Sequence, residues 1–264
     1  MASRQVLIGV IGGSGLYNLE NLTPVETANP KTPWGLPSSP ITLRAAFWRE
    51  VSIFSETWNI AQVSFILPSD VPARANIAAL KSLGVKVIVA FSAVGSLREQ
   101  IHPGDFVVPD QASFIRFSII DRTKGVRPAS FFEGTSIVAH AMFGDPFDTQ
   151  LTKALIPMIQ NLAREAEISY ALVATATDYD AWRVSEEPVT VAEVYKTLSN
   201  NADRSRKITA TILEELHEIV ERGDVLTSAE GGMQYSLITR DWPEEDRKKL
   251  AFVLPKYFSK SEAN

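Results

Sequence analysis

Three short apolar runs along the chain each end in small or polar residues. The runs are Val6–Ile11, Val85–Phe91 and Tyr170–Ala176. Continuous apolar runs of this length, bounded by turn residues, are typical of strands buried on both faces of a sheet. The sequence therefore predicts three buried strands. The segments that follow them are Gly12–Gly15, Ser92–Ser96 and Asp178–Asp180.

Helical spacing of the apolar residues predicts three helices. The first is Val71–Leu83, with Gly84 as its C-cap. The second is Thr149–Glu167, with a kink or break at Pro157. The third is Thr190–Arg222.

Thr190 is the predicted N-cap of the third helix, because Glu193 completes a capping box with it. Two short strands are predicted within Ile41–Phe54, and one more within Phe106–Pro109. Since the chain shows neither a repeat nor a linker, the economical prediction is a single α/β domain over residues 1–264, with a helical part from about 190 to 264.

The composition argues against several classes of function. Lys+Arg 26 against Asp+Glu 31 gives a formal net charge of -5, so nucleic acid is not an expected partner. With Cys 0 and three widely separated histidines, neither a disulfide framework nor a metal site is expected. No run approaches the roughly 18 apolar residues of a membrane helix, and no signal peptide is apparent, so we expect no membrane association and a cytoplasmic location.

The glycine-rich segment around Ser14 is a candidate anion site. Glycines after a buried strand let backbone N–H groups converge on an anion, and the Ser14 hydroxyl adds a donor, so phosphate is the natural ligand. The segment lacks the G-x-G-x-x-G spacing of a dinucleotide site and the Gly-Lys-Ser/Thr of a P-loop. A plain glycine turn explains it equally well.

Ser92 and Ala93 are the second candidate, because they follow the second predicted strand. Ligands of open α/β sheets bind outside the carboxyl ends of the strands, where the Ser92 hydroxyl and the Ala93 amide would lie. Taken alone, the segment is better explained as a strand-to-helix turn with Ser96 as the N-cap.

The third candidate is Asp178, Tyr179 and Asp180. A carboxylate accepts a hydrogen bond from an exocyclic amine and, when protonated, donates one to a ring nitrogen, which suits a 6-aminopurine. An isolated pair of this kind is more often a polar turn. Mg²⁺ would need further oxygen ligands, and glycosidase carboxylates rarely lie so close on one loop. Combined with the two anion candidates, the pair favours an enzyme that brings phosphate and a nucleoside together.

Long segments of the chain resemble the purine nucleoside phosphorylase superfamily, and within it the fungal 5'-methylthioadenosine phosphorylases. They run through most of the first 200 or so residues and continue near the C-terminus: IGVIGGSGLY, TPWGLPSSPI, LPSDVPARANIAALKSLGV, VIVAFSAVGSLREQIHPGDFVVPDQ, IIDRTKGVRPASFFEG, FGDPFD, LAREAEISY, ATATDYDAW and KKLAFVLPKYF. The resemblance implies a three-layer α/β fold of the phosphorylase/hydrolase type, with a central mixed sheet flanked by helices.

The resemblance also implies an activity, namely phosphorolysis of S-methyl-5'-thioadenosine to adenine and 5-methylthioribose 1-phosphate by a pentosyltransferase of methionine and purine salvage. Phosphate is then a co-substrate, and neither a cofactor nor a metal is implied. A homotrimer is implied as well, located in the cytoplasm, with the nucleus as a second location.

Roles for individual residues follow from the resemblance. The implied phosphate-binding residues are Ser14, Ser92 and Ala93. Asp178 is the implied catalytic residue and hydrogen-bonds purine N7, while Asp180 binds the N6 amine or shares these roles. Tyr179 lies between them, and Val191 lies near the 5'-methylthio group. An Asp at 178 favours adenine over 6-oxopurines, because its acceptor meets an amine instead of a carbonyl.

Two departures from the family bear on activity. The Arg-His-Gly stretch that supplies a phosphate-binding arginine is replaced by SETWNIAQVSFILPSD, for which Arg74 is a weak candidate substitute. The EGP-x-FSTRAES and NM-[ST]-x-x-PE motifs, which supply a base-stacking phenylalanine and ribose contacts, are absent where Asn161 runs into Leu162. Their absence predicts a sheet that lacks part of its strands and a base pocket that lacks one wall.

Two alternatives stay open at this point. A non-catalytic relative would bind a purine or join the trimer without turnover. A 6-oxopurine nucleoside phosphorylase would prefer inosine, against which Asp178 argues.

Overall fold

A central mixed sheet organises the chain. The computed structural model describes residues 6–12, 22–46, 49–55, 68–109, 126–141, 160–179, 190–222, 229–237 and 242–259. Its seven-stranded sheet has the order β2-β3-β4-β1-β5-β7-β6. The strands are β1 (Ile8–Gly12), β2 (Leu22–Ala28), β3 (Ile41–Ala46), β4 (Arg49–Ser55), β5 (Val87–Ser96), β6 (Phe106–Val107) and β7 (Ser169–Tyr179). The four inner strands β4, β1, β5 and β7 run parallel, whereas β2, β3 and β6 pair antiparallel.

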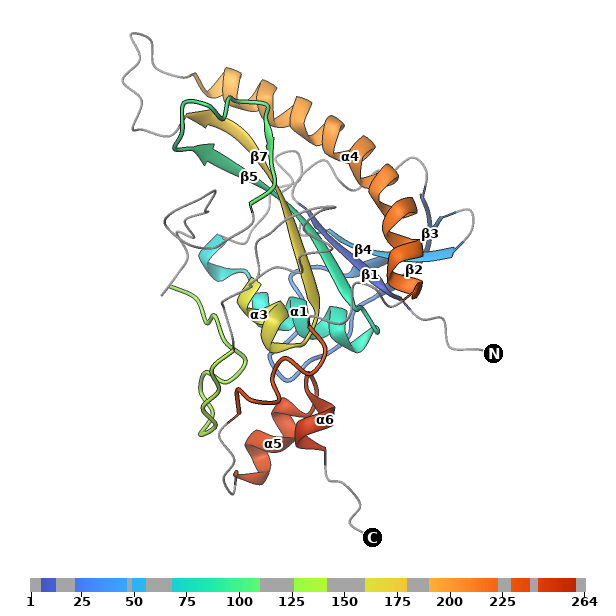
Figure 1. Cartoon of the computed structure of the whole chain (residues 1–264), viewed down its shortest axis with the longest axis vertical. Coiled ribbons are helices and arrows are strands. Elements are labelled where there is room, and N and C mark those ends of the chain that lie inside the picture. Colours follow the sequence, from blue (N-terminus) through green and yellow to red (C-terminus); the bar gives the residue numbers. More distant parts are fainter. Residues whose placement is uncertain are drawn as a thin grey trace.

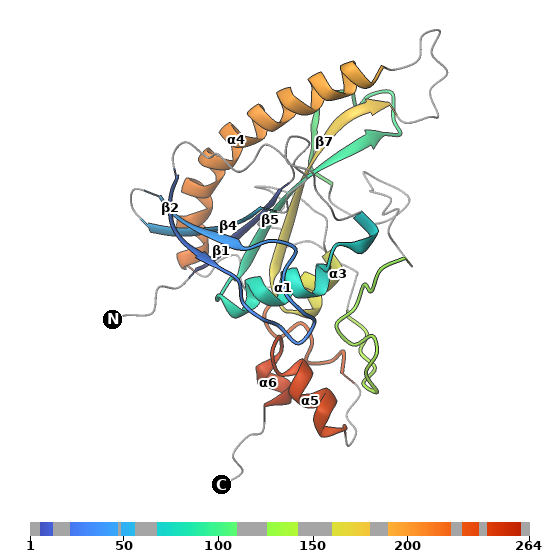
Figure 2. The ribbon, with the colours of Figure 1, turned by 180° about the vertical axis from the view of Figure 1, so that it is seen from behind.

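Helices lie on both faces of this sheet, which confirms the predicted three layers. One face carries α1 (Ala73–Ser82) and α3 (Gln160–Glu165), and the other carries α4 (Val191–Arg222) (Figure 1). The short helices α5 (Glu244–Leu250) and α6 (Pro255–Phe258) lie near the end of the sheet where β7 begins, as the view from behind also shows (Figure 2). None of the helices in the described ranges is long and apolar enough to cross a membrane.

Each face of the sheet has its own hydrophobic core. Side chains of β5 and β7 alternate between the faces, because successive residues of a strand point to opposite sides. Ile88 and Leu172 pack with the α1 and α3 side, whereas Val89 and Val173 pack with the α4 side. The apolar runs seen in the sequence are therefore continuous because both faces are covered.

The predicted strands are present, and two of them are longer than predicted. β5 continues beyond Phe91 to Ser96, and β7 continues beyond Ala176 to Tyr179. The expected strand-to-helix turn with an N-cap at Ser96 is wrong, because Ser92–Ser96 extends the strand by pairing with β7. The two short strands within Ile41–Phe54 are confirmed as β3 and β4.

The helix predictions are confirmed at α1 and α4. Gly84 follows α1 with φ 93, the left-handed conformation expected of a C-terminal glycine. At the start of α4, Glu193 N donates to Thr190 Oγ1 over 3.3 Å, and Thr190 N donates to Glu193 Oε2 over 2.9 Å, which forms the predicted capping box. Of the helix predicted over Thr149–Glu167, α3 covers Gln160–Glu165, and Pro157 lies outside the described residues.

Candidate functional site

The carboxyl ends of β1, β5 and β7 lie side by side. β5 pairs with β1 at Ile11↔Ala90 and with β7 at Ser92↔Ala174, all in parallel register. Residues that follow these three strands therefore gather at one edge of the sheet, where open α/β folds bind ligands. β1 ends at Gly12, and Ser14 lies just beyond it, outside the described residues.

Ser92 and Ala93 lie where β5 leaves the core. The preceding residues of the strand are buried, whereas Ser92 is half-buried and Ala93 is exposed. The Ser92 hydroxyl lies 3.4 Å from the Ala93 carbonyl oxygen, a long hydrogen bond within one strand that a better acceptor would replace. The Ser92 carbonyl accepts from Thr175 Oγ1 over 3.3 Å, which fixes the backbone against β7.

A β-bulge places Asp178. The register is Val94↔Ala176 and then Gly95↔Asp178, so Thr177 is an extra residue on β7. One extra residue transfers the side chains that follow to the other face of a strand. Asp178 consequently lies beside Gly95, which has no side chain, and it is half-buried.

Thr177 orients the Asp178 carboxylate. The Thr177 hydroxyl lies 2.6 Å from Asp178 Oδ1 and 3.2 Å from the Val94 carbonyl oxygen. Because a hydroxyl has one proton, it donates preferentially to the charged and closer carboxylate oxygen. The hydrogen bond from Thr177 occupies Oδ1, and among the described residues no hydrogen bond is made to Oδ2.

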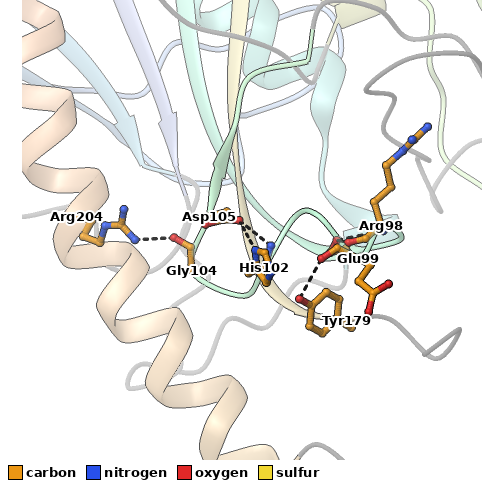
Figure 3. A network of polar contacts seen from close by, with 8 residues as sticks. Arg98, Glu99, His102, Gly104, Asp105, Tyr179 and Arg204 are labelled. Carbon is orange, nitrogen blue, oxygen red and sulfur yellow. Dashed lines mark hydrogen bonds and ion pairs between the residues drawn. The ribbon is translucent and has the colours of Figure 1, made fainter. Parts of the chain in front are cut away.

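Tyr179 fastens the 97–105 loop to the end of β7. Its hydroxyl donates to the Glu99 carbonyl over 3.3 Å, and its ring packs edge-on against His102 at 6.3 Å between centroids (Figure 3). Within the loop, His102 N donates to Asp105 Oδ2 over 2.7 Å. Tyr179 thus contacts protein groups and has a supporting role, whereas the sequence placed it among the ligand-binding residues; its contact with substrate stays a prediction.

The described structure brings Ser92, Ala93 and Asp178 to one edge of the sheet. Along β5, Gly95 opposite Asp178 is three residues beyond Ser92, a separation of about 10 Å at 3.3 Å per residue. Asp180 lies outside the described residues, and Val191 is the first residue of α4, with a side chain that is not described. Roles for Ser14, Asp180 and Val191 stay predictions.

The structure also bears on the expected role of Arg74 and on the question of a metal site. Arg74, the suggested substitute for a phosphate-binding arginine, donates from Nη1 to the Glu133 carbonyl over 3.1 Å, and its role with phosphate stays a prediction. Across the ranges that the structure describes, no cluster of three His, Cys, Asp or Glu side chains could hold a metal ion.

Sequence reasoning missed Thr177 and Asn201. Asn201 donates from Nδ2 to the Ala176 carbonyl over 2.9 Å, directly before the bulge. Its burial was readable from helical spacing, since it begins a buried row of α4: Asn201, Ser205, Thr209, Leu213, Leu216 and Val220. No sequence signal indicated the bulge at Thr177.

Comparison with known proteins identifies the family of this chain. The model of a family described as Phosphorylase superfamily matches residues 7–161. S-methyl-5'-thioadenosine phosphorylase 1 of Puccinia graminis f. sp. tritici is 46% identical over 98% of this chain and 100% of its own length. S-methyl-5'-thioadenosine phosphorylase of Coprinopsis cinerea is 43% identical over 98% and 99%.

One solved structure is similar to this chain over nearly its whole length. A methylthioadenosine phosphorylase sourced from an antarctic soil metagenomic library matches with a TM-score of 0.78 and 30% identity, over 96% of this chain and 100% of its own. The Puccinia alignment spans 314 positions, 50 more than the 264 residues of this chain, so at least 50 aligned positions have no counterpart in this chain. The chain therefore belongs to the S-methyl-5'-thioadenosine phosphorylase family within the phosphorylase superfamily.

Proposed function

We propose that this protein catalyses phosphorolysis of S-methyl-5'-thioadenosine to adenine and 5-methylthioribose 1-phosphate. The observation that carries the proposal is the parallel pairing of β5 with β7, which puts Ser92, Ala93 and Asp178 at one edge of the sheet. Relatives that match almost the whole chain have this activity in their names.

The two ends of the site have separate tasks in the reaction. The Ser92 hydroxyl and the Ala93 amide, with Ser14, hold phosphate so that one of its oxygens attacks C1' of the ribose. As the new C–O bond forms, the C1'–N9 bond breaks and its electron pair moves onto the purine. The purine N7 takes up a proton from water as the base departs, and Asp178 Oδ2 stabilises the departing base by accepting a hydrogen bond from this N7–H.

Asp178 also explains the choice of base. Thr177 donates to Oδ1, which leaves Oδ2 as an acceptor for the purine edge. A carboxylate accepts from the amine of adenine, whereas it meets the carbonyl of a 6-oxopurine oxygen to oxygen, so the 6-oxopurine is bound less well. Asp180 shares the contact with the amine, and Val191 lies beside the 5'-methylthio group.

The direct test is incubation of the purified protein with S-methyl-5'-thioadenosine and phosphate, followed by chromatography for adenine. We expect adenine only when phosphate is present, and slower turnover when inosine replaces the substrate. Adenine release at the level of the buffer control would overturn the proposal and favour a non-catalytic purine-binding relative. Faster turnover of inosine would favour a 6-oxopurine phosphorylase.

The assembly and location belong to the same proposal. We infer a homotrimer from the resemblance to the family, and a location in the cytoplasm with the nucleus as a second compartment. Light scattering after gel filtration should give three times the 29.1 kDa chain mass. We also infer that no metal takes part, so a chelator should leave the rate of adenine release unchanged.

A further inference from the structure

Helix α4 is fastened to the end of β7 and to the turn beside it. Asn201 and Arg204 are three positions apart and share one face of the helix. Asn201 Nδ2 donates to the Ala176 carbonyl over 2.9 Å. Arg204 Nη1 donates to the Gly104 carbonyl over 2.5 Å (Figure 3). The guanidinium carbon of Arg204 also lies 4.7 Å from the centre of the Phe106 ring.

The backbone of Ala176 links the Asn201 contact to the turn at Gly104. Its carbonyl also accepts from Gly104 N over 2.8 Å, and its N–H donates to the Asp105 carbonyl over 2.9 Å. Thr177, the extra residue of the bulge, follows Ala176 directly, and Asp178 comes next. The bulge interrupts the β5–β7 ladder at Thr177, so the hydrogen bonds that Asn201, Gly104 and Asp105 make to Ala176 add support to the pairing that resumes at Asp178.

Packing alone does not explain Asn201 at this position. The residue is 3% exposed, and within the described part of the chain its Oδ1 has no hydrogen-bond partner. An unpaired amide oxygen in the interior is less favourable than an apolar side chain of the same size. The favourable contribution of Asn201 therefore comes from the bond that Nδ2 makes to Ala176.

We propose that Asn201 is a positioning residue for the base-recognition carboxylate, and that it acts by fixing the Ala176 peptide and thereby the bulge that presents Asp178. The proposal rests on the proposed function in assigning adenine as the ligand of Asp178. Arg204 supports the same bulge less directly, through the Gly104 turn.

The test compares Asn201→Leu with Asn200→Leu. Leucine has the branched shape of asparagine, although it is larger, and it has no donor; Asn200 is the exposed neighbour on the same helix. Two quantities are measured in each variant: ligand affinity by calorimetry, for adenine and for phosphate, and hydrogen exchange of a peptide that covers residues 174–179. We expect Asn201→Leu to weaken adenine binding about tenfold and to speed exchange at 176–178, with phosphate affinity unchanged. Asn200→Leu should match the wild type in every measurement.

Unchanged adenine affinity in a folded Asn201→Leu protein would overturn the proposal, as would unchanged exchange at 176–178. If the wild type binds no adenine, the proposed function fails, and the exchange measurement alone still decides whether Asn201 holds the bulge. If Asn201→Leu does not fold, Arg204→Met decides, because Arg204 is exposed and its replacement keeps the aliphatic stem. That variant should weaken adenine binding about threefold, since it removes only the indirect support; no change would contradict the proposal.

Discussion

At the two ends of the central sheet, charged side chains have different surroundings. Where β7 begins, Glu165 is 5% exposed and accepts from Phe131 N over 2.6 Å, and burial raises its pKa to about 7. Burial also lowers the pKa of Lys81 to about 8 at the end of α1. Where β7 ends, Asp178 is half-buried. Thr177 donates to its carboxylate, and Asn201 donates to the backbone carbonyl of Ala176, two residues before it.

The shifted pKa values of Glu165 and Lys81 come mainly from burial in the packing around the start of β7. Glu167 also contributes to packing where β7 begins. Its Oε1 accepts from Tyr257 Oη over 2.6 Å and from Met233 N over 3.1 Å. These bonds tie the C-terminal segments to the start of β7. Shifted pKa values often indicate catalytic sites, but ion pairs and buried carboxylates that stabilise a fold shift them too. Substitutions at the two ends should therefore separate activity from stability.

The largest effect is expected from Asp178→Ala. Losing the group that stabilises the departing purine should lower kcat/KM for S-methyl-5'-thioadenosine about a thousandfold. The melting temperature should change little, because Asp178 is at the edge of the core. Asp203→Ala, an exposed carboxylate on α4, is the control and should keep full activity. A rate within threefold of the wild type for Asp178→Ala would contradict the assignment.

Glu165→Gln tests how the pH dependence of stability arises from the buried carboxyl near the start of β7. The unfolded chain loses this proton near the ordinary glutamate pKa of 4.5, while the folded chain keeps it up to a pKa of about 7, so stability falls as pH rises between these values. Denaturant unfolding should show the wild type losing roughly 2–3 kcal/mol between about pH 5 and about pH 8 relative to Glu165→Gln. Exposed Glu245→Gln should follow the wild type. Parallel pH profiles for wild type and Glu165→Gln would refute the buried-carboxyl account.

Tyr257→Phe should reduce stability while leaving the site intact. It removes one hydrogen bond to the Glu167 carboxylate, which should lower the free energy of unfolding by about 2 kcal/mol. Tyr235→Phe is the matched control, because Tyr235 is 91% exposed. Adenine affinity should be unchanged in both variants, and a loss of affinity in Tyr257→Phe would show that the two ends are coupled.

The smallest effect is expected from Thr190→Ala at the start of α4. The change removes the Thr190 hydroxyl from the capping box and should lower the free energy of unfolding by about 1 kcal/mol. Thr211→Ala, at an exposed position inside the same helix, should be neutral or slightly stabilising because alanine is the better helix former. Equal effects of the two changes would show that the capping box contributes nothing at this end of the helix.

Strand and helix periodicity predicted the buried strands and the helices of this fold, whereas the three layers were implied by the resemblance to the phosphorylases. The apolar runs of β1, β5 and β7 and the capping box of α4 depend on local patterns. The far ends of β5 and β7 were missed, since Ser92–Ser96 and Thr177–Tyr179 have the small and polar composition of turns. Pairing between the two strands overrides that local preference, and no single segment shows it.

The candidate site was likewise predicted only in part, because some of its residues follow local patterns and others depend on distant contacts. Ser92 and Asp178 were predicted from their places after apolar runs, and the described structure puts them at one edge. Thr177 and Asn201 were not predicted, because their importance comes from contacts across 83 and 25 positions of the chain. Such contacts depend on register and helix docking, which are tertiary properties.

A crystal structure of the protein with adenine and phosphate would test the central claim most directly. We expect the N6 and N7 edge of adenine within hydrogen-bond distance of Asp178, and the anion against Ser92 and Ala93 at about 10 Å along the strand direction. Adenine bound away from the end of β7, or turned with its other edge towards Asp178, would contradict the account.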